Sequence, residues 1–181
     1  MTNRKKQSQI LNDFVKNKDG KYEYIGPMHR YSSSIPRSRA YRNLGLLTGL
    51  MLVFAIIAGS VRAAGATHAI YIVVPYIFVV LMCGFFIYHY FELILGKDPM
   101  RDYIYQSTVM RFPFYLWVIL IASIITLVGE MIYLFMHGVG EYLNGTIIFF
   151  GCMALTTVFA YLWIKYFKLL SWEEIKKEEA E

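Results

Sequence analysis

A carboxylate stands inside one of the most apolar stretches of this chain. Glu130 follows the uncharged run of residues 112–129, and Thr126 lies about one helical turn before it. A charged side chain inside a membrane helix costs about 2.5–3.5 kcal/mol on insertion scales, so such a residue is a candidate functional group by default. His137 lies seven residues beyond Glu130, on the same helical face. Glu130, Thr126 and His137 therefore form the main candidate polar cluster.

Arg62 is the strong cation expected nearest to this cluster, because it ends the first apolar stretch on the same side of the membrane. Three hypotheses follow for Glu130. It forms a structural ion pair with Arg62, it handles protons or a substrate, or it is a single polar residue near the interface. Removing one partner of a buried ion pair is strongly destabilising, so the first hypothesis gives both side chains a structural role.

A second candidate pair is His89 and Glu92, which share a helical face at a spacing of three residues. The Glu-x-x-His motif of di-iron bundles has this spacing in the opposite order, and it needs further ligands that the sequence lacks. Haem would need facing histidines in mid-membrane. We therefore expect neither a metal nor a cofactor. Cys83 and Cys152 lie in separate apolar blocks and predict no disulfide.

Four long apolar blocks must position these residues. The chain has 181 residues, of which 57% are hydrophobic, whereas soluble domains average about 45–50%. A helix of about 20 apolar residues crosses the hydrocarbon core, and backbone groups in lipid must be satisfied within the segment. The sequence therefore predicts an all-α membrane protein. It is a four-helix transmembrane bundle with short outer turns, and its spans lie near residues 43–64, 69–95, 112–136 and 142–168.

The distribution of positive charge predicts the orientation. Ten of the 18 Lys and Arg residues lie in residues 1–42, and the outer turns hold only Arg62. Cytoplasmic loops carry the excess of Lys and Arg in membrane proteins, so both termini should be cytoplasmic. We expect an integral, multi-pass protein of a bacterial plasma membrane.

The chain divides into three segments. Residues 1–42 should form a basic cytoplasmic segment, with a short interfacial helix at Gln9–Val15 and a flexible linker at Arg30–Arg42. Residues 43–170 should form the transmembrane domain, and residues 171–181 a charged cytoplasmic tail. Ser171 and Glu174 have capping-box spacing, which predicts a short helix in that tail.

Packing and partners follow from residue type. Gly45 and Gly49 form a GxxxG pair, which predicts helix packing inside the bundle or between two copies of the chain. Phe112 and Trp163 are expected in an aromatic belt at the inner interface. The basic N-terminal segment predicts contact with an anionic inner leaflet. The chain has no folded module for reading nucleic acid, so none is expected as a partner.

The sequence favours a non-enzymatic function, because it lacks a P-loop, an HExxH pair and a GxSxG turn. The leading hypothesis is an accessory or assembly subunit that binds another membrane protein. The alternative is a small transporter or channel-like protein that uses Glu130 in the outer half of the bundle. A membrane enzyme is the third hypothesis, and it would need a second polar group that converges on Glu130.

The orientation gives a first testable prediction. Single cysteines placed at Thr67 and Asn144, in the two outer turns, should react with an impermeant thiol reagent added to intact cells. A cysteine at Ser33 should not react. Labelling at Ser33 alone would reverse the orientation.

Overall fold

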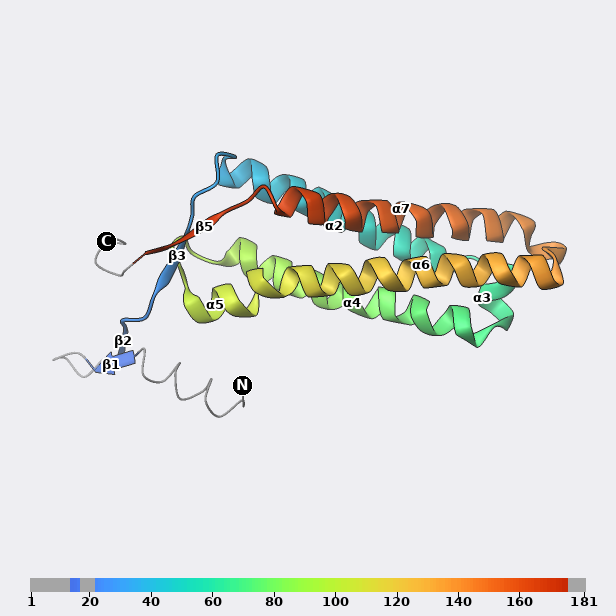
Figure 1. Cartoon of the computed structure of the whole chain (residues 1–181), viewed down its shortest axis with the longest axis horizontal. Helices are drawn as coiled ribbons and strands as arrows, with labels where there is room; N and C mark the ends of the chain where they lie inside the picture. The colour runs from blue at the N-terminus through green and yellow to red at the C-terminus, as the bar shows by residue number, and fades with distance from the viewer. Residues whose placement is uncertain (1–13, 17–21, 176–181) are drawn as a thin grey trace.

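Four long helices run side by side in the computed structural model, which describes residues 14–16 and 22–175 (Figure 1). Each is long and apolar enough to cross a membrane, which confirms the four-helix architecture of a membrane protein. The helices are α2 (Arg37–Ser60), α4 (Ile70–Leu95), α6 (Phe112–His137) and α7 (Leu143–Phe167). The first begins six residues earlier than expected, so the C-terminal half of the predicted linker at Arg30–Arg42 is helical.

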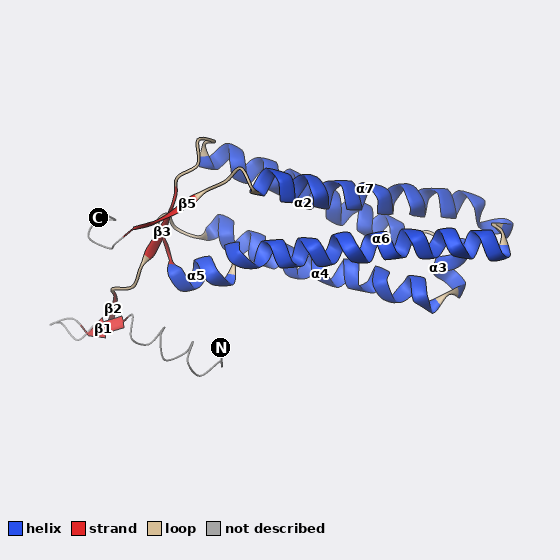
Figure 2. Ribbon diagram, in the orientation of Figure 1, coloured by secondary structure: helices blue, strands red, loops and turns tan. Residues whose placement is uncertain are grey.

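The helices form two closely packed pairs. α2 packs along α7 and α4 along α6, and α6 joins the pairs by its contact with α7. The ends of the bundle differ (Figure 2). One end, here called the sheet end, carries the short strands. The other, here called the turn end, carries the connections α3 (Ala64–His68) and η2 (Gly140–Tyr142).

An aromatic cluster fills the core near the sheet end. Trp163, Phe86 and Phe112 are fully buried, and their ring centroids lie 5.0–5.3 Å apart. The indole N–H of Trp163 donates to Thr48 Oγ1 at 3.1 Å, so its one polar atom is satisfied. The expectation that Phe112 and Trp163 belong to an interfacial belt is therefore wrong. Their rings point into the bundle because α6 and α7 pack against each other there.

A three-stranded antiparallel sheet joins three distant parts of the chain at the sheet end. β3 (Met28–Tyr31) lies between β4 (Met100–Arg101) and β5 (Trp172–Ile175). Tyr31 pairs with Trp172. The helix predicted to begin at Ser171 is wrong over residues 172–175, because Ser171 directly precedes β5 and Glu174 lies within it, paired with His29 of β3. The rest of the predicted helix lies outside the described residues.

Polar contacts fix the sheet to the bundle. His29 Nε2 lies 2.9 Å from Asp102 Oδ1, and the His29 ring stacks on Tyr105 at 3.9 Å. Arg37, the first residue of α2, donates to the carbonyl of Gly96 at 2.8 Å. The loop between α4 and α6 contains α5 (Asp102–Ser107) and η1 (Val109–Arg111). These contacts and the sheet pairing thus hold β3, the loop between α4 and α6, and β5 next to one another.

The expected interfacial helix at Gln9–Val15 is mostly outside the described residues. Its last two residues, Phe14 and Val15, instead belong to the strand β1 (Phe14–Lys16). That strand pairs antiparallel with β2 (Tyr22–Tyr24). The two strands form a separate hairpin ahead of β3.

The two glycines of the GxxxG pair have different surroundings. A Cβ atom on Gly45 would collide with the Tyr90 hydroxyl, which donates to the carbonyl of Tyr41 at 2.7 Å. No atom lies within 4 Å of the Cβ position at Gly49. Gly45 therefore serves packing inside the bundle, and only Gly49 is free to meet another chain.

Gly145 gives the clearest test of this packing. A Cβ atom there would collide with the backbone carbonyl of Arg62, which cannot move as a side-chain tip can. Gly145→Ala should lower the free energy of unfolding by about 1–3 kcal/mol, the usual cost of overpacking. Unfolding in mixed detergent measures this. Gly151→Ala in the same helix is the matched control, because nothing lies within 4 Å of its Cβ position. Equal stability of the two variants would contradict the packing.

Candidate functional site

The connection between α2 and α4 folds into the turn end of the bundle. α3 contacts α4, α6 and α7. Its first residues, Ala64 and Gly65, are buried, as is Ala63 before them. The first N–H groups of any helix lack a partner within the helix. In a buried turn these groups need acceptors from elsewhere in the protein.

Glu130 supplies one of these acceptors. Its side chain is fully buried, and Oε1 accepts a hydrogen bond from the Gly65 N–H at 2.9 Å. A Cβ atom at Gly65 would collide with Glu130 Oε2 and with Ile72, so a larger residue there would require both side-chain tips to shift. Oε2 has no hydrogen-bond partner among the described residues. The carboxyl group is thus packed directly against the backbone of α3.

Thr146 supplies a second acceptor. Its Oγ1 accepts a hydrogen bond from the N–H of Ala64 at 3.0 Å, and the side chain is buried. Side chains of α6 and α7 therefore satisfy two successive N–H groups of α3. Leaving one such buried group without a partner costs about 1–3 kcal/mol. The arrangement holds the α2–α4 connection against α6 and α7, one helix from each pair.

The predicted ion pair between Glu130 and Arg62 does not form. Among the described residues, neither Glu130 nor Arg62 takes part in an ion pair. The side chain of Arg62 is exposed, and its carbonyl packs against the α-carbon of Gly145. The chain turns at Arg62 so that its backbone faces the bundle, and Gly65 takes the place expected for the guanidinium.

The other two members of the predicted cluster do not join Glu130 by hydrogen bonds. Thr126 is buried on the same face of α6, but its hydroxyl donates to the carbonyl of Ala122 at 2.9 Å. His137 is exposed, and its ring stacks on Tyr133 at 4.6 Å. As the last residue of α6, His137 lies beyond the packed part of that face.

Sequence reasoning missed Gly65 and Thr146. The available signal was the composition of the connection: after Arg62, residues 63–67 are only Ala, Gly and Thr. An exposed turn is usually rich in polar residues, whereas small residues in a membrane protein mark close contact between segments. The sequence could have indicated a buried connection, but not which side chains accept its hydrogen bonds.

The secondary pair, His89 and Glu92, lies near the sheet end. His89 Nδ1 is 3.1 Å from Glu92 Oε2, and its Nε2 is 3.0 Å from the hydroxyl of Tyr115 on α6. Thr108 also donates to Glu92 Oε2, at 3.3 Å. His89 thus links α4 with α6, and Glu92 links α4 with the loop between them. Across the described part of the chain, no three His, Cys, Asp or Glu side chains form a group that could hold a metal ion.

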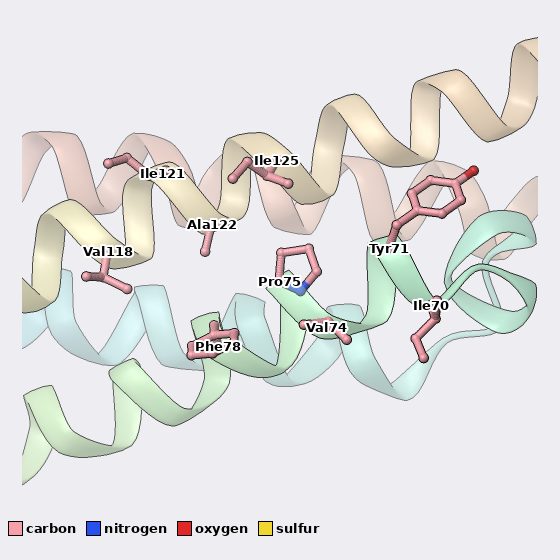
Figure 3. Close-up of a pocket in the computed structure, with 9 residues that line it drawn as sticks. All are labelled: Ile70, Tyr71, Val74, Pro75, Phe78, Val118, Ile121, Ala122 and Ile125. Atoms are coloured by element: carbon pink, nitrogen blue, oxygen red, sulfur yellow. The ribbon is translucent and has the colours of Figure 1, made fainter.

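Two open grooves lie between α4 and α6. The turn-end groove, of about 660 Å³, lies beside Pro75 and Ala122 (Figure 3). Its lining is Ile70, Tyr71, Val74, Pro75, Phe78, Val118, Ile121, Ala122 and Ile125. The sheet-end groove, of about 700 Å³, is lined by Val80, Leu81, Gly84, Phe85, Tyr88, His89, Arg111 and Tyr115. Glu130 lines neither groove.

The fold and these contacts define a four-helix, multi-pass membrane protein whose buried carboxylate serves a backbone contact. No family model matches the chain, and comparison with curated proteins and with solved structures gives no match either.

The contact between Glu130 and Gly65 predicts an unequal response to substitution. Glu130→Gln keeps an acceptor for the Gly65 N–H and should retain most of the stability. Glu130→Leu removes the acceptor and should lower the free energy of unfolding by about 1–3 kcal/mol. Arg62→Gln should leave stability nearly unchanged. Unfolding in mixed detergent measures the stability of each variant. Equal losses of unfolding free energy in Glu130→Gln and Glu130→Leu would contradict the contact.

Proposed function

We propose that this protein is a non-enzymatic accessory or assembly subunit that binds another membrane protein through its helices. The observation that supports this most is the open glycine at position 49. It lies in an exposed apolar stripe of α2 with Leu46 and Val53, which are 63% and 49% exposed. No atom lies within 4 Å of the Gly49 Cβ position. Small residues let a second helix approach closely in a membrane.

Burial of Glu130 favours this proposal over transport. A transporter that uses this carboxylate must expose it to water in at least one state. The side chain is fully buried, contacts the backbone of Gly65 and lies outside both grooves. A structural role accounts for the carboxyl group without a substrate. The transporter or channel-like alternative therefore has less support.

The proposed orientation places the sheet end in the cytoplasm of a bacterial cell. Its support is the distribution of Lys and Arg in the sequence, because ten of the 18 precede position 43 and the outer turns hold only Arg62. The strands β3, β4 and β5 would then lie against the inner leaflet. Anionic lipids of that leaflet would attract the basic residues. A bound partner could contact this sheet as well as α2.

Site-specific photo-crosslinking tests the proposal in native membranes. A photoreactive amino acid at Leu46 or Val53 should give one product of discrete mass, which mass spectrometry identifies as the same second protein from both positions. The same probe at Ile121, in the turn-end groove of α6, should not give that product. Cross-linking only to lipid from Leu46 and Val53 would contradict the proposal.

A matched pair of glycine variants sharpens this test. Gly49→Leu should abolish the product, because the side chain fills the open position on α2. Gly151→Leu fills an equally open position on α7 and should leave the product unchanged. A product of two copies of this chain would overturn the accessory role and favour a homo-oligomer built on Gly49.

A further inference from the structure

The sheet-end groove has a polar end and an apolar floor. Arg111, His89 and Tyr115 lie at the polar end, and Leu81, Gly84 and Phe85 line the floor. Gly84 leaves the floor open, because no atom lies within 4 Å of its Cβ position. Leu81 precedes Tyr88 by seven residues, which is about 10 Å along a helix. The groove is therefore long and apolar, and it begins beside a cation.

The guanidinium of Arg111 is available to a ligand. Arg111 is exposed and directly precedes α6. Within residues 14–16 and 22–175, it makes no side-chain hydrogen bond and no ion pair. Glu92, a carboxylate one turn after His89 on α4, does not line the groove and is contacted by His89 and Thr108. The charge of Arg111 is therefore not neutralised by the protein.

The walls beside Arg111 are held in fixed positions. His89 is buried, and both of its ring nitrogens have partners, Glu92 on α4 and the Tyr115 hydroxyl on α6. The His89 and Tyr115 rings also stack, with centroids 5.3 Å apart. This contact joins the two helices at the polar end of the groove. A ligand would meet a preformed site there, which lowers the cost of binding.

We propose that the sheet-end groove binds one anionic phospholipid, with the headgroup phosphate on Arg111 and an acyl chain along Leu81, Gly84 and Phe85. Arg111 lies at the end of a membrane-length helix, where a phosphate would be, and a guanidinium can bind phosphate through two parallel hydrogen bonds. The turn-end groove is of similar volume, but its lining is apolar and contains no charged residue. It can receive acyl chains but cannot select a headgroup. The lipid site goes beyond the proposed subunit role and does not depend on it.

Native mass spectrometry of the purified full chain tests the proposal. The protein is released from detergent after titration with phosphatidylglycerol or with phosphatidylcholine of the same acyl chains. We expect a single tightly held phosphatidylglycerol. Phosphatidylcholine carries the same phosphate, but its choline cation would lie near the Arg111 guanidinium and be repelled by it, so this lipid should be lost at lower collision energy. Glycerol phosphate, which has the headgroup chemistry without the chains, should not displace the lipid at equal concentration. Equal retention of both lipids, or displacement by glycerol phosphate, would overturn the proposal.

Three variants separate the parts of the site. Arg111→Gln should weaken phosphatidylglycerol binding about fivefold, as expected for one cation near a headgroup, and should remove the preference over phosphatidylcholine. Gly84→Leu fills the open floor and should weaken binding of both lipids. Lys97→Gln removes an exposed cation at the same end outside the groove and should change neither.

If Arg111→Gln and Lys97→Gln weakened phosphatidylglycerol binding equally, the lipid would be attracted by the overall positive charge of this end. That result would contradict a specific site at Arg111. Unchanged binding by Gly84→Leu would place the acyl chain elsewhere and contradict the groove. Thermal unfolding in detergent should be the same for all three variants, because each changed position is exposed.

Discussion

The structure depends on acceptors for backbone N–H groups in a turn that is buried within the bundle. Residues 63–65 of the connection between α2 and α4 are buried. They enter the turn end, where water is excluded and unsatisfied backbone groups are costly. Glu130 and Thr146 accept the hydrogen bonds of Gly65 and Ala64. Because these acceptors come from α6 and α7, the connection also holds helices that are distant in the sequence.

At other close contacts of the bundle, a glycine also lets a polar group of one segment approach a neighbouring helix. Gly145 lets the carbonyl of Arg62 approach α7, and Gly59 lets the Tyr76 ring reach α2, where its hydroxyl donates to the carbonyl of Ala55 at 2.9 Å. Tyr90 does the same at Gly45. Polar side chains are thus used mainly to satisfy groups within the protein. The open positions lie on the outer surface, at Gly49 and Gly151 and in the grooves beside α4. The proposed interactions with lipid and with another protein would use that surface.

The long helices could be predicted from the sequence because lipid imposes one requirement on every span. An apolar stretch of sufficient length must be helical, and this holds regardless of tertiary contacts. The burial of Glu130 and Thr126 on one face could also be predicted, since a spacing of four residues fixes their common side. The partner of Glu130 could not. Charge suggested Arg62, but the direction of the chain after α2 decides whether backbone or side chain faces inward.

The sheet was missed for a related reason. β3, β4 and β5 contain only two to four residues each, and they come from segments separated by about 70 residues along the chain. Pairing between distant strands overrides the local capping signal at Ser171, as tertiary contacts commonly override local preferences. His29 and Asp102, which help to fix the sheet, are 73 residues apart and show no local pattern.

Glu130 is the hydrogen-bond acceptor for the backbone N–H of Gly65. Amide hydrogen exchange at Gly65, measured by NMR on the protein in lipid nanodiscs, tests this contact. We expect strong protection of this amide in the wild-type protein and in Glu130→Gln. In Glu130→Leu, protection should fall at Gly65 while amides in the middle of α4, such as Cys83, stay protected. Rapid exchange at Gly65 in the wild-type protein, or protection that Glu130→Leu leaves unchanged, would contradict this contact.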